Sequence, residues 1–176
     1  MKPWKEVAAS VLPDGIEIAE WGFPEHSEES FLRARSLCKE NKCGSYGTSW
    51  GCPPGCDLSV GKISGRFSRV GVFKRRYVVD LGDKDAIERM GEETQTSVRN
   101  VVIALRKEGY DCMGFSDGGC RYCGVCAYPE PCRFPEMLVP SISVLGLDLK
   151  GYMASNGEEL RFEKGSVTMY GFVMMA

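Results

Sequence analysis

Apolar positions recur at different spacings along the chain, and the spacing separates expected strands from expected helices. Residues 69–81 are dense in β-branched and aromatic side chains, which indicates a strand. From Asp83 onward the apolar residues follow a helical spacing, and a long amphipathic helix is predicted that stops at Gly109. Its expected buried stripe consists of Ile87, Met90, Val98, Val101 and Leu105, with Thr94 at the remaining step. A short apolar run at 110–116 predicts the next strand.

The order strand, long helix, strand over residues 69–116 predicts a crossover unit. We therefore expect an α+β or α/β fold with a small sheet and a long crossover helix. Residues 167–175 are a further strand candidate. Ser27, followed by two glutamates, predicts the start of a helix that would end near Cys38. All 176 residues are expected to form a single metal-binding domain, since this length suits one core.

After residue 132 the sequence predicts short helices and a turn. Pro135 and Pro140 each stand where a short helix could begin. The Asn-Gly pair that ends at Gly157 indicates a turn, and a hairpin between 149–153 and 160–163 is one interpretation of it.

Composition and charge narrow the class of protein. Hydrophobic residues make up 43% and charged residues 26% of the chain, as is usual for a soluble protein, and the formal charge is only −2. A basic footprint for nucleic acid or for an anionic membrane is therefore not expected. The chain shows neither a signal-peptide pattern nor a run of roughly 20 apolar residues. We expect a cytoplasmic protein, in which thiols stay reduced.

Eight of the nine cysteines fall into two groups of four. The first cysteine loop, residues 38–56, has the spacing C-x4-C-x8-C-x3-C, and the second, residues 120–135, has C-x2-C-x2-C-x5-C. Four thiolates complete a coordination shell for zinc or for an iron–sulfur cluster. The candidate metal and cofactor ligands are Cys38, Cys43, Cys52 and Cys56 in the first loop and Cys120, Cys123, Cys126 and Cys132 in the second.

The second loop favours iron–sulfur over zinc. Three thiols at a repeat of three residues can wrap a cuboidal cluster, as in bacterial ferredoxins with C-x2-C-x2-C-x3-C-P. Here the fourth cysteine, Cys132, follows after five residues, and an exchange of ligands between the two loops is open. Zinc remains the alternative, although zinc sites usually present two C-x2-C pairs that are a dozen or more residues apart.

The first loop fits zinc and iron–sulfur equally well, and only its co-occurrence with the second favours a cluster. Its Cys52-Pro-Pro-Gly-Cys56 segment is stiff, because proline fixes φ. A radical S-adenosylmethionine pattern, C-x3-C-x2-C, is excluded because Ser59 occupies its third position. His26, the only histidine, lies outside both loops, and Cys112 is expected to be a buried small hydrophobe.

Cationic residues accompany both loops. Lys39 and Lys42 lie in or beside the first and Arg121 and Arg133 in the second. They could offset the charge of the thiolates and raise reduction potentials, or they could be ordinary solvated loop residues.

The chain resembles a family of cysteine-rich microbial proteins with two four-cysteine groups, described only as predicted metal-binding and without an established reaction. The matching stretches are the Cys-Pro-Pro segment at 52–54, the long helix, Gly119 to Cys132 with its three spaced cysteines, Arg133, Pro135-Glu136, Pro140-Ser141 and Gly146-Leu147-Asp148. They span about residues 38–149. Phe134 departs from the pattern, since many relatives would have a polar residue or histidine there. The resemblance implies metal binding.

The leading hypothesis is an iron–sulfur protein with two [4Fe–4S] clusters, one in each loop, that transfers electrons to a redox partner protein. Shells completed by cysteine leave no open ligand position, which suits electron transfer better than substrate chemistry. One alternative is a zinc-binding structural or adaptor module. Another is an iron–sulfur enzyme or maturation factor in sulfur or cofactor metabolism. No catalytic residue can be assigned.

Overall fold

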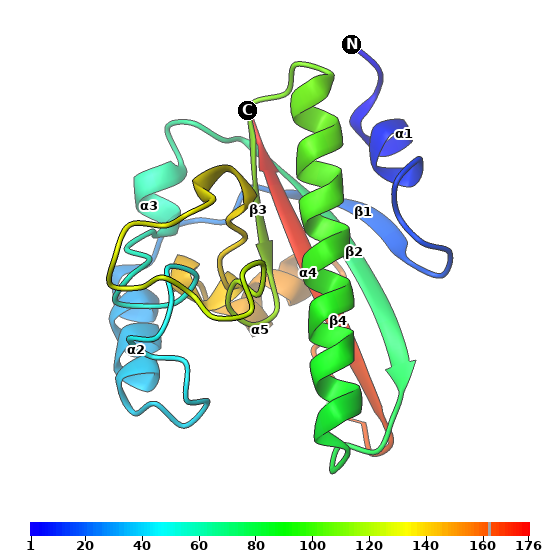
Figure 1. Cartoon of the computed structure of the whole chain (residues 1–176). Coiled ribbons are helices and arrows are strands. Elements are labelled where there is room, and N and C mark those ends of the chain that lie inside the picture. Colours follow the sequence, from blue (N-terminus) through cyan, green and yellow to red (C-terminus); the bar gives the residue numbers. More distant parts are fainter. Residues whose placement is uncertain (162) are drawn as a thin grey trace.

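The described residues build a four-stranded antiparallel sheet in the order β1-β2-β4-β3 (Figure 1). The computed structural model describes residues 1–161 and 163–176. The strands are β1 (Glu17–Gly22), β2 (Arg69–Val78), β3 (Cys112–Ser116) and β4 (Ser166–Met175). The α-helices are α1 (Trp4–Ala9), α2 (Glu28–Lys39), α3 (Val60–Ile63), α4 (Lys84–Lys107) and α5 (Leu149–Ser155), and the 3-10 helices are η1 (Pro135–Met137) and η2 (Ile142–Leu145). Helices combined with an antiparallel sheet make this an α+β fold, which confirms the first of the two expected classes.

The predicted strand–helix–strand unit over 69–116 is present as β2, α4 and β3. Both strands pair with β4 in antiparallel fashion, so they run parallel to each other with β4 between them. The register places Val72 and Phe115 on either side of Phe172. The last strand of the chain is therefore the centre of the sheet, and α4 crosses over it between β2 and β3 (Figure 1).

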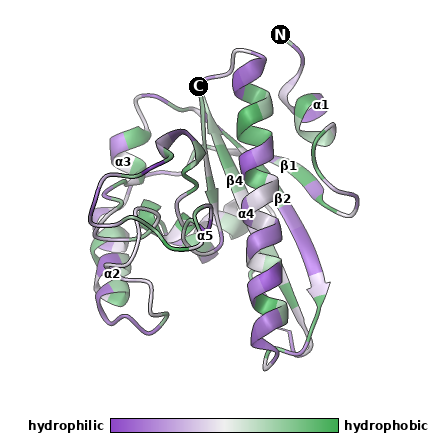
Figure 2. Cartoon of the chain, in the orientation of Figure 1, coloured by the Kyte–Doolittle hydropathy of each residue, from purple (hydrophilic) through white to green (hydrophobic). Residues whose placement is uncertain are grey.

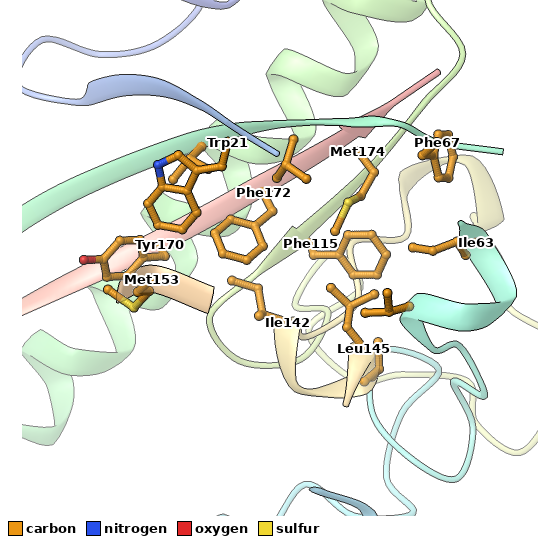
Figure 3. Packing of buried hydrophobic residues seen from close by; sticks show 14 of the residues in the cluster. Trp21, Ile63, Phe67, Phe115, Ile142, Leu145, Met153, Tyr170, Phe172 and Met174 are labelled. Carbon is orange, nitrogen blue, oxygen red and sulfur yellow. The ribbon is translucent and has the colours of Figure 1, made fainter. Parts of the chain in front are cut away.

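Each face of the sheet carries its own hydrophobic core. On one face, Phe115 and Phe172 pack with Ile142 and Leu145 of η2, as Figure 3 shows. This cluster also contains Ile63 of α3, Trp21 of β1, and Met153 of α5. On the other face, α1 and α4 cover the sheet, through residues that include Trp4, Val98, Val101 and Leu105. Successive side chains of a strand point to opposite faces, so β4 contributes to both cores. A strand buried on both faces has a nearly continuous apolar sequence, as β4 has.

The expected stripe of α4 is largely confirmed. Met90, Val98, Val101 and Leu105 are buried, and Asp83 caps the helix by accepting a hydrogen bond from the amide of Ala86. Figure 2 shows hydrophobic and hydrophilic bands alternating along this helix (Figure 2). Across the described residues, the helices lack the combination of length and apolar content that crossing a bilayer requires.

Several predictions of local structure need correction. Helix α1 and strand β1 arise in a segment for which no element was predicted. Strand β2 ends at Val78 instead of residue 81. The first arm of the suggested hairpin, 149–153, is helical, because Asp148 caps α5 by accepting from the amide of Gly151. The second arm, 160–163, includes residue 162, which lies outside the described residues.

Candidate metal centre

The two cysteine loops lie side by side, on the same side of the molecule as α2 and α3 (Figure 1). Their backbones meet at two glycines. A Cβ on Gly51 would lie 2.3 Å from the backbone nitrogen of Cys120, and a Cβ on Gly119 would lie 2.7 Å from the sulfur of Cys52. Real Cβ atoms essentially never make contacts this short, so glycine at both positions permits the close approach of the loops.

Aromatic and backbone contacts extend this junction. The indole Nε1 of Trp50 donates to the carbonyl oxygen of Glu130 at 2.8 Å, and the Trp50 and Tyr128 rings pack edge to face at 5.1 Å between centroids. The amide of Ser141 donates to the carbonyl oxygen of Gly51 at 2.9 Å. The structure thus brings the two predicted groups together, which their separation in sequence did not indicate.

In the first loop, Cys52 and Cys56 are buried, Cys38 is half-buried in the last turn of α2, and Cys43 is exposed. Burial, followed by the charges of the other three thiols of the group, raises the pKa of Cys52 to about 11, against a hydrogen bond with Ser49 that lowers it. All three neighbours therefore lie within electrostatic range of Cys52. A metal that binds Cys52 would therefore have to displace the proton of its thiol.

Cys56 has a different environment. Burial raises the pKa of its thiol, whereas a hydrogen bond from the backbone of Leu58 and the positive charge of Arg35 lower it. Arg35 lies on α2, and its Nη2 donates to the carbonyl oxygens of Leu58 at 2.7 Å and Val144 at 2.8 Å. The sequence reasoning missed Arg35. The available signal was its position three residues before Cys38, on the same face of the predicted helix.

The second loop and the segment that follows it are attached to the polar part of α4. The side chain of Gln95, 1% exposed, donates to the carbonyl oxygen of Val139 at 3.2 Å. Arg99, 8% exposed, donates to the Gln95 side chain at 3.0 Å and to the carbonyl oxygen of Met137 at 2.9 Å. Its guanidinium also lies over the ring of Tyr122, 4.9 Å from the centroid. These two residues were missed as well, although their spacing of four residues within the helix suggests a shared partner.

The four thiols of the second loop, Cys120, Cys123, Cys126 and Cys132, are all half-buried. Arg133 helps to close this loop, because its Nη2 donates to the carbonyl oxygen of Val125 at 2.5 Å. Arg121 forms an ion pair with Glu88 of α4. Both arginines therefore have structural partners. Of the lysines, Lys42 pairs with Glu40 at 2.7 Å.

The remaining candidates lie outside the junction. Cys112 is buried in β3 with its thiol 3.8 Å from the carbonyl oxygen of Val102, as expected of a small hydrophobe. His26 is exposed and pairs with Glu28 at 3.2 Å.

The donor set suits a sulfur-ligated metal or cluster. All nine cysteines are free thiols. Two buried nitrogens, Arg35 Nη1 and Arg121 Nε, lack a hydrogen-bond partner among the described residues, and both belong to arginines within or next to a cysteine loop. Within residues 1–161 and 163–176, however, no three Cys, His, Asp or Glu side chains are already grouped as metal ligands. The eight-cysteine ligand set therefore stays a prediction.

Comparison with protein-family models gives a match over residues 31–175 to the family described as predicted metal-binding protein (DUF2284). The matched region includes both cysteine loops. No curated protein and no solved structure matches the chain.

Proposed function

The chain belongs to this family of predicted metal-binding proteins, and on that premise we propose that its two cysteine loops hold two [4Fe–4S] clusters that relay single electrons to a partner protein. The observation that carries the proposal is the contact between the loops, where Cys52 lies against Gly119 and Gly51 against Cys120. Two redox centres held by touching loops would be neighbours. Adjacent centres are what an electron relay requires, whereas two independent structural metals need no such contact.

The cysteines of the first loop would hold one cluster and those of the second loop the other. When bound, each cluster would supply one-electron redox chemistry. The spacing of Cys120, Cys123 and Cys126 favours a cuboidal cluster over a single tetrahedral ion. Arg35 and Arg121 each have a buried N–H group without a partner among the described residues, and such groups are suitable hydrogen-bond donors to cluster sulfurs.

Access for a partner is consistent with electron transfer. The second loop carries exposed apolar side chains, with Val125 81% exposed, and the first loop exposes Cys43. Both loops therefore reach the surface beside thiols that are buried or half-buried. A partner protein could approach either centre without opening the hydrophobic cores.

Metal analysis of anaerobically purified protein tests the proposal. We expect iron and acid-labile sulfide in amounts that fit two clusters, a brown colour, and visible absorption that bleaches with dithionite. A colourless protein with stoichiometric zinc would contradict the proposal and support the structural or adaptor module. A cluster with one replaceable ligand, whose substitution abolishes catalytic turnover while most of the iron remains, would point to the enzyme or maturation factor.

Electron paramagnetic resonance tests the adjacency of the centres. The dithionite-reduced protein should show spectra broadened by magnetic coupling between the two clusters. A variant with Cys120→Ser and Cys123→Ser should keep the first cluster and show an uncoupled signal. Identical line shapes in the two proteins would contradict a relay between neighbouring clusters.

A further inference from the structure

Arg35 occupies an anchored position beside the first cysteine loop. It lies one turn before Cys38 on α2, and residues at this spacing share a helix face. Its Nη2 is held by the carbonyl oxygens of Leu58 and Val144, and its guanidinium lies over the ring of Phe31, 4.4 Å from the centroid. Because α2, the chain after Cys56 and η2 all contact it, the orientation of the guanidinium is fixed.

The other terminal nitrogen of Arg35 is unusual. Nη1 is buried, and it has no hydrogen-bond partner within the part of the chain that the structure describes. A buried donor without a partner is costly, and native proteins rarely retain one without a role. No carboxylate of the described residues lies within ion-pairing distance of Arg35 either.

Arg121, which also has a buried nitrogen without a partner in the described part of the chain, provides a contrast. Its charge is already matched by Glu88, and its guanidinium packs against Gly91 of α4. Arg35 forms no ion pair with a carboxylate of the described residues, although the pKa of Asp57, lowered chiefly by its pairing with Lys62, is also lowered by the charge of Arg35. Its neighbour is instead Cys56, because the backbone of a single residue, Leu58, bonds both of them. The N–H of Leu58 bonds the Cys56 thiol and the carbonyl of Leu58 accepts from Arg35.

We propose that Arg35 is a positioning residue of the first metal centre, whose free Nη1–H donates to a sulfur of that centre and whose charge stabilises its more negative state. The sulfur would be the Cys56 thiolate or a sulfide of the bound cluster. The redox consequence rests on the proposed function, whereas the contact with a metal-bound sulfur does not. Hydrogen bonds to sulfur and local charge both set the potential of a cluster. Arginine suits this role, because one planar fork can bind two carbonyls and a sulfur together.

The test is a redox titration of the full chain, followed by electron paramagnetic resonance, for wild type, Arg35→Gln and Arg35→Lys. Cys52→Ser identifies which wave belongs to the first centre. Arg35→Gln should make the reduction of the first centre at least about tenfold less favourable in its equilibrium constant. For one electron, this lowers the potential of that wave by about 59 mV or more. Arg35→Lys should give a smaller shift in the same direction, because it retains the charge but not the fork. The wave of the second centre should not move.

Arg33, an exposed residue of the same helix, provides the matched controls. Arg33→Gln and Arg33→Lys should leave both waves in place. If Arg35→Gln fails to fold, as judged by circular dichroism, the comparison of Arg35→Lys with Arg33→Lys decides. Unchanged potentials in a folded Arg35 variant, or equal shifts of both waves, would overturn the proposal.

The metal content of wild type separates this inference from the proposed function. If wild type contains zinc without iron, the electron relay is wrong, and the Arg35 contact is then tested by the release of zinc to a chelator. Arg35→Lys should release zinc from the first centre several-fold faster than Arg33→Lys. Equal release rates would overturn the role of Arg35 in that case.

Discussion

The sulfur of Cys52 lies directly against Gly119, the residue that precedes the first cysteine of the second loop, and a Cβ at position 119 would lie 2.7 Å from it. Each cysteine loop therefore packs against the other. A substitution in one loop at this junction should change the metal content or the stability of the other loop, so single substitutions can test the contact.

Gly119→Ala should displace the Cys52 thiol, because the added methyl group would lie only 2.7 Å from its sulfur. We expect a loss of stability of about 1–3 kcal/mol and a lower metal content of the first centre. Gly51→Ala should be more severe, since the methyl group there meets the backbone of Cys120, which cannot move aside. Gly65→Ala is the control, as its added Cβ would meet nothing within 4 Å. Metal analysis and urea unfolding measure the effects, and equal behaviour of all three variants would refute the contact.

Cys52→Ser and Cys112→Ala should differ sharply in the metal that they retain. We expect Cys52→Ser to lose the metal of the first centre, about half of the total if each loop holds one cluster. Cys112→Ala should retain all metal, because this thiol is buried in β3 beside Val102, and should cost only about 1–2 kcal/mol of stability. Iron, sulfide and zinc analysis of the two proteins is the measurement. Loss of metal from Cys112→Ala, or full retention in Cys52→Ser, would be inconsistent with the assigned ligands.

Arg99→Met should loosen the attachment of the segment after the second loop to α4. The substitution leaves the buried Gln95 side chain and the carbonyl oxygen of Met137 without a donor, which should cost about 1–3 kcal/mol. Arg89→Met, at an exposed position of the same helix, should change stability little. Urea unfolding measures the cost, and proteolysis with mapped cleavage sites should find the segment around residue 137 more susceptible in Arg99→Met alone. Matching results for the two variants would argue against this attachment.

The stability of the protein should depend on the protonation of Asp117. Burial raises the pKa of this carboxyl group from 3.8 to about 6, although the amide of Tyr170 donates to it at 2.7 Å. The folded protein thus holds the proton to a higher pH than the unfolded chain does. The free energy of unfolding should therefore fall as the pH rises from about 4 to about 6, by about 1–3 kcal/mol.

Asp117→Asn should abolish that fall, because the amide carries no titratable proton and still accepts from Tyr170. Urea unfolding at several pH values across the window measures it. Asp111→Asn is the control. Asp111 is exposed, and its hydrogen bond with Arg66 lowers its pKa, so it titrates below the window and its substitution should leave the fall in place. A pH dependence that survives in Asp117→Asn would show that another group is responsible.

The sequence by itself determined the elements whose signals are local. A helical repeat of apolar residues predicted α4, because one face of that helix covers the sheet. The density of β-branched and aromatic residues predicted β2, and a similar apolar run predicted β4, which is buried on both faces. The spacing of eight cysteines predicted metal binding, and the family match confirms that assignment at this level. Each of these signals lies within one helix, one strand or one of the two cysteine loops.

Only the tertiary structure decided which segments meet. Trp50 contacts Glu130, eighty residues away in the chain, and no local pattern encodes such a pairing. Asp148 caps a helix where extended structure was expected, because a single capping residue outweighed a weak apolar pattern. Arg35 is an ordinary charged helix residue in the sequence. Its significance comes from its bonds to the carbonyls of Leu58 and Val144 and from a buried nitrogen that has no partner in residues 1–161 and 163–176. Spacing along a chain specifies which side chains share a local surface, whereas long-range contacts depend on how those surfaces pack against one another.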